Sequence, residues 1–413
     1  TLKQKIFFNN ERLVARQNSI AIAIRGLIMV IGSGTFSTRK SRQRMNVVVN
    51  ITSTLGRKTG IGFYVLELLK ALEAEGEIQT ETFPRGLLLR LNSLGSRVKN
   101  NLDVDHPSRG LTRLWKGAAS RIKKSILRML REMNRFANRV SFRHLMNHAR
   151  YDLYHEPNYI PYPVELPTVV TIPDLSVLLH PEWHPADRAR YFDKYFHQSL
   201  PHCAHFLAIS ESVNREVVEH LGIAPEKVST TVLGIRDGLC PLPQGVVEAE
   251  LKRLDLPKKY LLHLGTLEPR KNVLMLMKAY CDLPAAVREE WPLLLVGKWG
   301  WATSEMAGFY QDVGRHHNVR HMGYVPDSAM NAIYNGARAL VFPSHYEGFG
   351  LPPLEMMACG GAVLASRADA LVEVAGGHAH HVAADDVEGW RDAMHRVVSE
   401  DEWWRQLREG VTE

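Results

Sequence analysis

Cysteine is scarce in this chain, and long apolar runs are missing. The four cysteines among the 413 residues show no pairing or metal-type spacing, which argues against a disulfide framework and suits a reducing cytoplasm. The apolar stretch at 19–34 is interrupted by Arg25 and is too short to predict a membrane span. Low-complexity tracts and short internal repeats are also missing, and the composition is ordinary for a soluble globular protein.

The chain does contain enough residues for more than one hydrophobic core, and it carries an excess of positive charge. A length of 413 residues predicts two domains. The net charge of +7 indicates an anionic partner, which charge alone does not identify as phosphate groups, anionic lipid or nucleic acid.

Residues 1–44 are expected to lie outside the fold. A basic cluster at 39–44 follows the apolar stretch, and Met45 then opens a valine-rich run at 46–51 that is typical of a buried strand. Our hypothesis is that Met45 is the true start and that residues 1–44 are an upstream extension. The alternative is a signal peptide, although the segment lacks a small-residue cleavage site followed by a disulfide-rich domain.

Strand-like and helical patterns alternate along the rest of the chain, which predicts α/β domains with parallel sheets. A glycine-rich turn at 56–62 separates the first strand from a helical run at 63–72. A stretch with proline and glycine at 239–248 indicates a linker, so we expect an N-terminal domain at 45–243 and a C-terminal domain at 244–413. Further strands are predicted at 153–155, 167–172, 205–209, 260–264, 293–296, 320–324, 339–342 and 362–365.

The segment 113–150 is unusually basic. It holds eleven Lys or Arg residues against one acid, Glu132, and apolar residues recur between the charges. A basic amphipathic helix of this kind is typical of a membrane-surface element. The alternative is a solvated helix that covers the N-terminal domain. Nucleic acid is not expected here, because the segment has few aromatic residues for stacking and no nucleic-acid-binding motif.

The stretch Glu347–Glu355, EGFGLPPLE, places two carboxylates around a glycine loop. A buried-strand pattern precedes it and a helical run at 354–358 follows, and prolines suit a first helical turn. The loop therefore predicts a helix N-terminus, where free N–H groups and the helix dipole favour an anion such as phosphate. The carboxylates suit the hydroxyls of a ribose or sugar. The alternative is an ordinary connection in which Glu355 caps the helix.

A second motif, GTLEPRKN at 265–272, follows the first predicted strand of the second domain. Ligands of open parallel sheets bind beyond the carboxyl ends of the strands, which is where Arg270 and Lys271 stand. Cations are unfavourable at a helix N-terminus unless an anion is present. We therefore favour a phosphate site over the alternative of two solvated surface cations.

The pairing of an E-x7-E loop with a G-x4-R-K-N turn resembles the retaining glycosyltransferases of family 4. The resemblance covers Met45 to about Glu413, with shorter matching pieces at 46–62, 171–176, 208–210, 232–235 and 323–326. It implies a GT-B fold, in which two Rossmann-like doubly wound domains face each other across a cleft and the C-terminal domain holds most of a nucleotide-sugar donor. Within the family, the chain most resembles mannosyltransferases of bacterial polysaccharide or lipopolysaccharide assembly.

The resemblance also implies roles for single residues. Arg270 and Lys271 would hold the donor diphosphate, and Glu347 would bind hydroxyls of the donor sugar. With Asp174 on the acceptor side, these are the implied catalytic residues. Glu355 would bind the ribose. The other implied donor-binding residues are Gly60, Gly62, Gly265, Tyr324, Val325, Phe349, Gly350 and Leu351.

One position departs from the family pattern. The family usually has His-Asp where this chain has Pro173-Asp174, and a proline side chain neither donates nor accepts a hydrogen bond. Either another residue takes over, with His155 and His180 as candidates, or activity is reduced. Asp174 itself has an alternative role as a turn or helix-cap acid.

The implied reaction transfers a sugar with retention of anomeric configuration, without a protein nucleophile, and the two cations stabilise the leaving group. We expect no metal and no cofactor, because no D-x-D or His/Asp cluster is placed along the chain as a metal site would need. The expected donor is GDP-mannose and the expected acceptor a lipid-linked oligosaccharide or polysaccharide precursor. The expected location is the cytoplasm, at the inner face of the cytoplasmic membrane.

Four alternatives stay open. The donor is a UDP-sugar such as UDP-glucose, or the protein is a non-catalytic nucleotide-sugar-binding relative that lost activity with Pro173. A nucleotide-sugar epimerase on the same fold is disfavoured by the motif pair. A membrane-peripheral nucleic-acid binder has only the basic segment in its favour.

Overall fold

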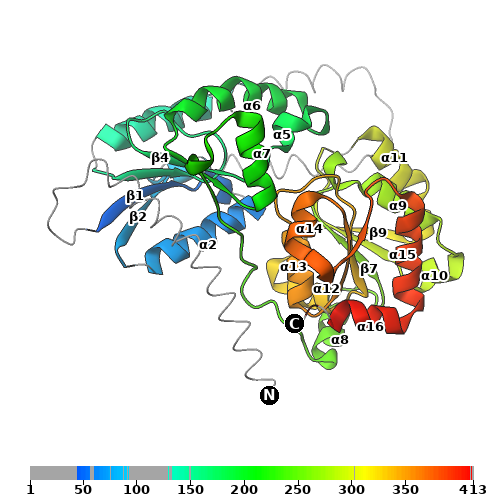
Figure 1. Ribbon diagram of the computed structural model, residues 1–413. Coiled ribbons are helices and arrows are strands. Elements are labelled where there is room, and N and C mark those ends of the chain that lie inside the picture. Colours follow the sequence, from blue (N-terminus) through cyan, green and yellow to red (C-terminus); the bar gives the residue numbers. More distant parts are fainter. Residues whose placement is uncertain are drawn as a thin grey trace. The chain divides into compact units, whose positions relative to one another are not determined.

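The computed structural model describes residues 44–55, 60–74, 76–86, 88–90, 92, 129, 133–147, 150–301, 303–409 and 411 (Figure 1). Contacts divide these residues into two compact units. The first takes the described parts of Thr1–Pro173 with Tyr195–Leu207 and Ile223–Thr231, and the second takes Asp174–Lys194, Ala208–Gly222 and Val232–Glu413. The predicted extension, the turn at 56–59 and most of the basic segment lie outside the described residues.

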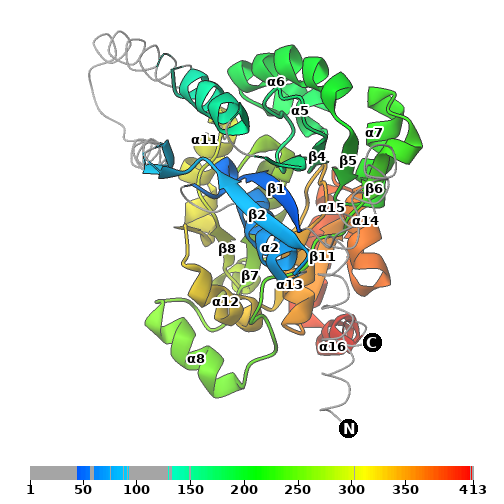
Figure 2. The same cartoon turned by 90° about the vertical axis from the view of Figure 1, so that its left-hand side faces the viewer.

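The first unit is built on a six-stranded sheet in the order β2-β1-β3-β4-β5-β6. The pairings of β1 with β2, of β1 with β3 and of β3 with β4 are parallel. Helix α2 (Gly60–Ala74) packs beside β2 and the short helix η1 (Thr52–Thr54) (Figure 2). The strands are β1 (Met45–Asn50), β2 (Ile78–Phe83), β3 (Leu153–Glu156), β4 (Thr168–Ile172), β5 (His205–Ala208) and β6 (Val228–Thr230).

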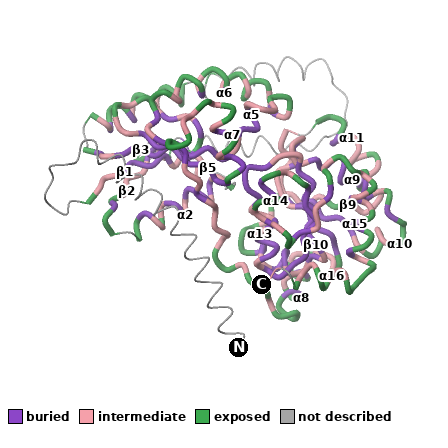
Figure 3. The backbone as a smooth tube through the Cα atoms, viewed as in Figure 1, coloured by how far each residue is buried: buried purple, intermediate pink, exposed green. Residues whose placement is uncertain are grey.

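The second unit holds a six-stranded sheet in the order β12-β11-β10-β7-β8-β9, in which every neighbouring pair is parallel. Four of its strands, including β7 and β10, are almost entirely apolar, as expected for strands buried on both faces (Figure 3). The strands are β7 (Leu261–Leu264), β8 (Leu293–Val296), β9 (Val319–Gly323), β10 (Ala339–Phe342), β11 (Ala362–Ser366) and β12 (His380–Val382).

Helices cover both faces of the second sheet, as in a doubly wound domain. One face packs against α9 (Val273–Cys281), α11 (Ser304–Asp312), α15 (Val387–Ser399) and α16 (Asp401–Glu409). The other packs against α8 (Gln244–Arg253), α12 (Met330–Gly336), α13 (Leu351–Ala358) and α14 (Asp369–Ala375). The remaining helices are α5 (Ser176–Leu179), α6 (Ala186–Ser199), α7 (Glu211–Leu221), α10 (Ala285–Glu290), η2 (Pro181–Trp183), η3 (Leu200–His202), η4 (Pro225–Lys227), η5 (Pro269–Lys271), η6 (Gly314–His317), η7 (Asp327–Ala329) and η8 (Gly376–His378).

The nine predicted strands are present, with small shifts at their ends, and two local predictions are corrected. Helix α2 begins at Gly60, so Gly60 and Gly62 lie in its first turn and not in a preceding loop. A Cβ at Gly62 would lie 3.0 Å from the carbonyl oxygen of Ser53, so close packing of α2 against η1 explains this glycine. The predicted linker at 239–248 contains the first half of α8, which begins at Gln244.

The carboxyl ends of β1 and β3 carry a buried polar pair. The Asn50 side chain donates to Glu156 Oε2 over 2.6 Å, and the Tyr154 hydroxyl donates to the same oxygen over 2.7 Å. Burial raises the pKa of Glu156 to about 8, although both bonds oppose the shift. The first unit therefore holds a carboxyl group whose protonated form is favoured near neutral pH.

This raised pKa makes the stability of the protein depend on pH. The stability it provides is complete below the ordinary pKa of 4.5 and is lost as the pH rises through about 8. Glu156→Gln removes the titrating carboxyl group. Between pH 4.5 and about 8, its free energy of unfolding should therefore rise relative to that of the wild type by up to about 1.4 kcal/mol per pH unit. Urea denaturation at pH 5 and pH 8 measures the difference, and the same pH dependence in both proteins would contradict the prediction.

Candidate active site

The two sequence motifs meet at the carboxyl edge of the second sheet. In its strand order, β7 lies between β8 and β10, so the order along the chain reverses between β7 and β10. Ligands of doubly wound folds bind at such a reversal. The loops that follow β7 and β10 carry Arg270 with Lys271 and Glu347 respectively. The fold therefore places all three side chains at the expected ligand position.

The loop after β7 is held by backbone geometry and by one side chain. Gly265 has a φ of +154°, and a Cβ at Gly297 would lie 1.9 Å from the carbonyl oxygen of Gly265, so only glycine allows this approach. Asn272, in the left-handed region at φ 56°, donates from Nδ2 to the carbonyls of Pro343 (3.3 Å) and Ala384 (2.8 Å). The loop is thereby fixed to those after β10 and β12.

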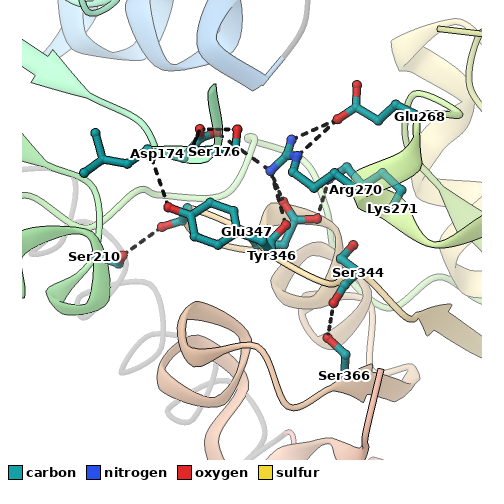
Figure 4. Close-up of polar contacts among 12 residues, drawn as sticks. Asp174, Ser176, Ser210, Glu268, Arg270, Lys271, Ser344, Tyr346, Glu347 and Ser366 are labelled. Carbon is teal, nitrogen blue, oxygen red and sulfur yellow. Dashed lines mark hydrogen bonds and ion pairs between the residues drawn. The ribbon is translucent and has the colours of Figure 1, made fainter. Parts of the chain in front are cut away.

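Arg270 and Lys271 converge on Glu347 (Figure 4). Arg270 Nη1 lies 3.2 Å from Glu347 Oε2, and Lys271 Nζ donates to Glu347 Oε1. The Arg270 guanidinium also bonds to Glu268 Oε1 over 3.1 Å and lies 3.7 Å from Asp174 Oδ2. The two cations thus lie among three carboxylates, and all five of these side chains are at most 16% exposed.

Glu347 is paired with both cations, and its predicted contact with hydroxyls of the donor sugar stays a prediction. Burial alone would raise the pKa of Glu347, but Lys271 and Arg270 outweigh it and hold the pKa below its usual value. The group is therefore ionised at neutral pH. A sugar hydroxyl could reach this carboxylate only in competition with Lys271 and Arg270.

The loop before α13 offers backbone donors. Gly350 is the residue before the helix, at a φ of 117° that favours glycine, and Leu351 is the first helical residue. Pro352 and Pro353 follow and lack an N–H. Among the described residues, none accepts from the N–H groups of Phe349, Gly350 and Leu351. These three groups are thus available to an anion at the helix N-terminus.

Glu355 lies in the second turn of α13, whereas the predicted helical run at 354–358 would place it in the first turn. Arg236 forms a bidentate salt bridge with this carboxylate: Nε donates to Oε1 over 2.7 Å and Nη2 donates to Oε2 over 2.8 Å. The Tyr334 hydroxyl donates to Oε2 over 2.6 Å. Burial would lower the pKa of Arg236, but Glu355 outweighs it and raises the pKa. The predicted contact of Glu355 with a ribose stays a prediction.

Asp174 begins a chain of side-chain hydrogen bonds. Its Oδ1 accepts from the N–H of Ser176 over 2.9 Å and from the Ser176 hydroxyl over 2.7 Å. His184 Nε2 lies 3.0 Å from the same hydroxyl oxygen. Because that hydroxyl gives its proton to Asp174, His184 Nε2 must be the donor. Asp174 therefore has the turn role that we gave as its alternative function, and it also lies beside Arg270.

His184 is the histidine that the structure links to Asp174, and our sequence reasoning missed it. His155 is buried in β3 and bonded to Thr171, and His180 stacks on Trp183 at 3.9 Å between ring centroids. Burial, followed by Arg188, lowers the pKa of His184 to about 4, so the ring is neutral. Its Nδ1 is buried and accepts no hydrogen bond from the described residues.

We expect His184→Ala to lower kcat about tenfold, because Ser176 loses the donor that fixes it against Asp174 and small displacements are costly in an active site. His184→Asn, which keeps an N–H donor, should recover part of the loss. Titration of His184 should not change the rate of the wild type between pH 6 and 9, since the ring stays neutral in this range. An unchanged kcat in a folded His184→Ala protein would contradict this role.

The other predicted donor-binding residues are placed in two regions. Tyr324 and Val325 directly follow β9, and the Tyr324 side chain is 47% exposed. Gly60 and Gly62 belong to the first unit. Among the described residues, no three or more His, Cys, Asp or Glu side chains are grouped to hold a metal ion. None of the helices in the described ranges combines the length and apolar character that a membrane crossing requires.

Comparison with known proteins identifies the family. The model of the family "Glycosyl transferases group 1" matches residues 248–412. O-antigen chain mannosyltransferase B of Escherichia coli is 32% identical over 347 residues, which cover 84% of this chain and 88% of that protein. The chain belongs to the group 1 glycosyltransferases. The matched residues 248–412 include Arg270, Lys271, Glu347 and Glu355 of the described site.

One further relative of this group 1 glycosyltransferase and one solved structure of similar fold complete the comparison. Serotype-specific mannosyltransferase WbdA of Escherichia coli is 30% identical over 58% of this chain, and the match spans 30% of that protein. WaaG, a glycosyltransferase involved in lipopolysaccharide biosynthesis, has a TM-score of 0.63 at 15% identity, over 89% of this chain and 94% of that chain. This likeness, with the two six-stranded doubly wound units, confirms the predicted GT-B fold.

Proposed function

We propose that this glycosyltransferase moves mannose from GDP-mannose, with retention, onto a lipid-linked oligosaccharide or polysaccharide precursor. The observation that carries the proposal is the convergence of Arg270 and Lys271 on Glu347 at the strand-order reversal. Two cations and three unused N–H groups suit a diphosphate, and Glu347 suits sugar hydroxyls. The mannose donor and polysaccharide acceptor are supported by the name of the 32% identical relative.

In the proposed reaction the bond between the anomeric carbon and the diphosphate breaks and GDP leaves, while Arg270 and Lys271 stabilise its growing charge. A hydroxyl of the acceptor forms the new bond to that carbon, and its proton passes to the leaving phosphate oxygen. The fork of Arg270 suits two phosphate oxygens, and Lys271 supplies a compact charge. Glu347 orients the sugar through its hydroxyls, and Asp174 lies on the acceptor side. No metal is part of the proposal, so activity should survive EDTA.

A donor screen tests the proposal. The protein is incubated with a lipid-linked mannosyl acceptor and either GDP-mannose or UDP-glucose, and the product mass identifies the sugar transferred. NMR of the new anomeric centre reports retention. Transfer from UDP-glucose alone would replace the mannose donor. Equal background from wild type, Arg270→Ala and Glu347→Ala would favour the non-catalytic alternative suggested by Pro173.

We further propose that the enzyme works at the anionic inner face of the cytoplasmic membrane. Among the described residues, seven large apolar side chains are exposed, and four of them, Met129, Met133, Phe136 and Val140, fall at 129–140. They follow helical spacing, and the opposite face of the helix at 133–147 packs Phe142 and other side chains into the first unit. Exposed arginines at 135, 139 and 143 accompany the apolar stripe.

Vesicle pelleting tests this location. Met133→Ser/Val140→Ser should bind less to vesicles with anionic phosphatidylglycerol than the wild type does. Val246→Ser/Val372→Ser is a matched control, because it also removes two exposed apolar side chains but in the second unit. Equal pelleting of the two double variants would refute a membrane role of this stripe.

A further inference from the structure

A cavity of about 410 Å³ opens beside Glu347 in the second unit. The loops after β10, β11 and β12, the first two turns of α7 and the first turn of α14 form its walls. Its volume falls within the range of about 300–1,000 Å³ that small-molecule sites occupy. Side chains that line it include Glu216, His345, Glu347, Arg367, Asp369 and Ala383.

The lining favours a neutral ligand with many hydroxyl groups. The carboxylates of Glu216, Glu347 and Asp369 line the cavity together with the guanidinium of Arg367. Glu347 already pairs with Lys271 and Arg270, and Asp369 lies 3.7 Å from Arg215. Arg367 forms no ion pair with any residue in the part of the chain that the structure describes. Hydroxyls can donate to the carboxylates and accept from Arg367, whereas carboxylates offer a phosphate no hydrogen-bond donor. A neutral ligand with several hydroxyl groups therefore suits this lining better than a phosphate does.

The cavity shares one wall with the donor site. Glu347 lines it and also pairs with Lys271. Tyr346 fixes that wall, since its hydroxyl donates to Glu216 and accepts from the N–H of Leu175 over 3.0 Å. A sugar in the cavity would therefore lie next to the carboxylate that faces the donor.

We propose that this cavity binds the terminal sugar of the acceptor, as an uncharged hexose. This inference rests on the proposed function and goes beyond it, because it assigns Arg367 and Asp369 to acceptor recognition. Arg367 donates to ring or hydroxyl oxygens, Asp369 accepts from hydroxyls, and the small side chain of Ala383 leaves room for the ring.

Binding of mannobiose to the whole protein, measured by ligand-observed NMR without donor, tests the site independently of turnover. Arg367→Ala and Asp369→Asn should each weaken binding about tenfold. Ala383→Phe, at an exposed position, should block the cavity without disturbing the core. Arg391→Ala and Asp392→Asn are matched controls, because this exposed pair lies outside the cavity on α15.

The outcomes separate this inference from the proposed function. Mannobiose binding that all three cavity variants leave unchanged, or that inorganic phosphate displaces at this cavity, overturns the acceptor site. Where the enzyme transfers mannose, the same variants should raise the KM for acceptor about tenfold and leave the KM for GDP-mannose unchanged. A failed donor screen with intact, cavity-dependent mannobiose binding would overturn only the proposed reaction.

Discussion

Replacing Arg270 with alanine is expected to lower kcat by about two to three orders of magnitude, as loss of one charge-stabilising donor does in other enzymes. Arg270 is the side chain that reaches Glu268, Glu347 and Asp174 together. Its removal takes away the fork that would hold the leaving phosphate. Single-turnover rates with saturating donor measure the effect on chemistry separately from binding.

Two controls make this result specific. Arg270→Lys keeps the charge but loses the fork, so its rate should lie between those of wild type and Arg270→Ala. Arg253→Ala removes an exposed arginine of α8 that pairs only over the surface with Glu250. Thermal unfolding checks that the variants are folded, since alanine leaves three carboxylates without their shared cation. A folded Arg270→Ala enzyme with wild-type kcat would refute the role.

Arg236→Ala is expected to destabilise the second unit by about 3–5 kcal/mol, because it leaves a buried charge without its partner. The Glu355 side chain is 4% exposed and that of Arg236 is 20% exposed. Urea denaturation measures the loss. Arg405→Ala, which breaks an exposed pair with Glu402, should cost no more than about 1 kcal/mol.

A double variant separates stability from donor binding. Arg236→Met/Glu355→Met replaces both charges with apolar side chains and should recover most of the stability. If Glu355 binds the ribose, this stable variant should still bind GDP at least about tenfold more weakly than wild type. Wild-type GDP affinity in the double variant would show that the pair only supports α13. A double variant as unstable as Arg236→Ala would contradict the explanation by unpaired charge.

Most of the fold could be predicted from local patterns, and the strands that escaped prediction share a physical reason. Strands β2, β6 and β12 were missed, and each stands at an edge of its sheet, although the fourth edge strand, β9, was predicted. An edge strand has a neighbour on one side only and is less buried, so it lacks a continuous apolar run. The sequence IQTETF of β2 shows this clearly. The central strands β7 and β10 were easy to predict for the opposite reason.

The candidate site could be predicted only where its residues stand close together in sequence. Arg270 with Lys271, and Glu347 with its glycine loop, are local motifs beside central strands. Arg236 was not predicted as a site residue, because its partner Glu355 is 119 positions away and no local sequence pattern indicates the pair. His184 likewise meets Asp174 only through Ser176, in a turn whose geometry the sequence does not disclose.

The pairing of Glu347 with Lys271 and Arg270 gives the two cations a resident counter-ion. An arriving diphosphate would compete with a carboxylate fixed by the protein, so donor binding becomes an exchange of one anion for another. The displaced carboxylate then needs hydrogen-bond donors, and the hydroxyls of the donor sugar can supply them. A free nucleotide would release Glu347 without offering such partners. On the proposed function, this exchange would therefore discriminate the intact sugar nucleotide from its spent product.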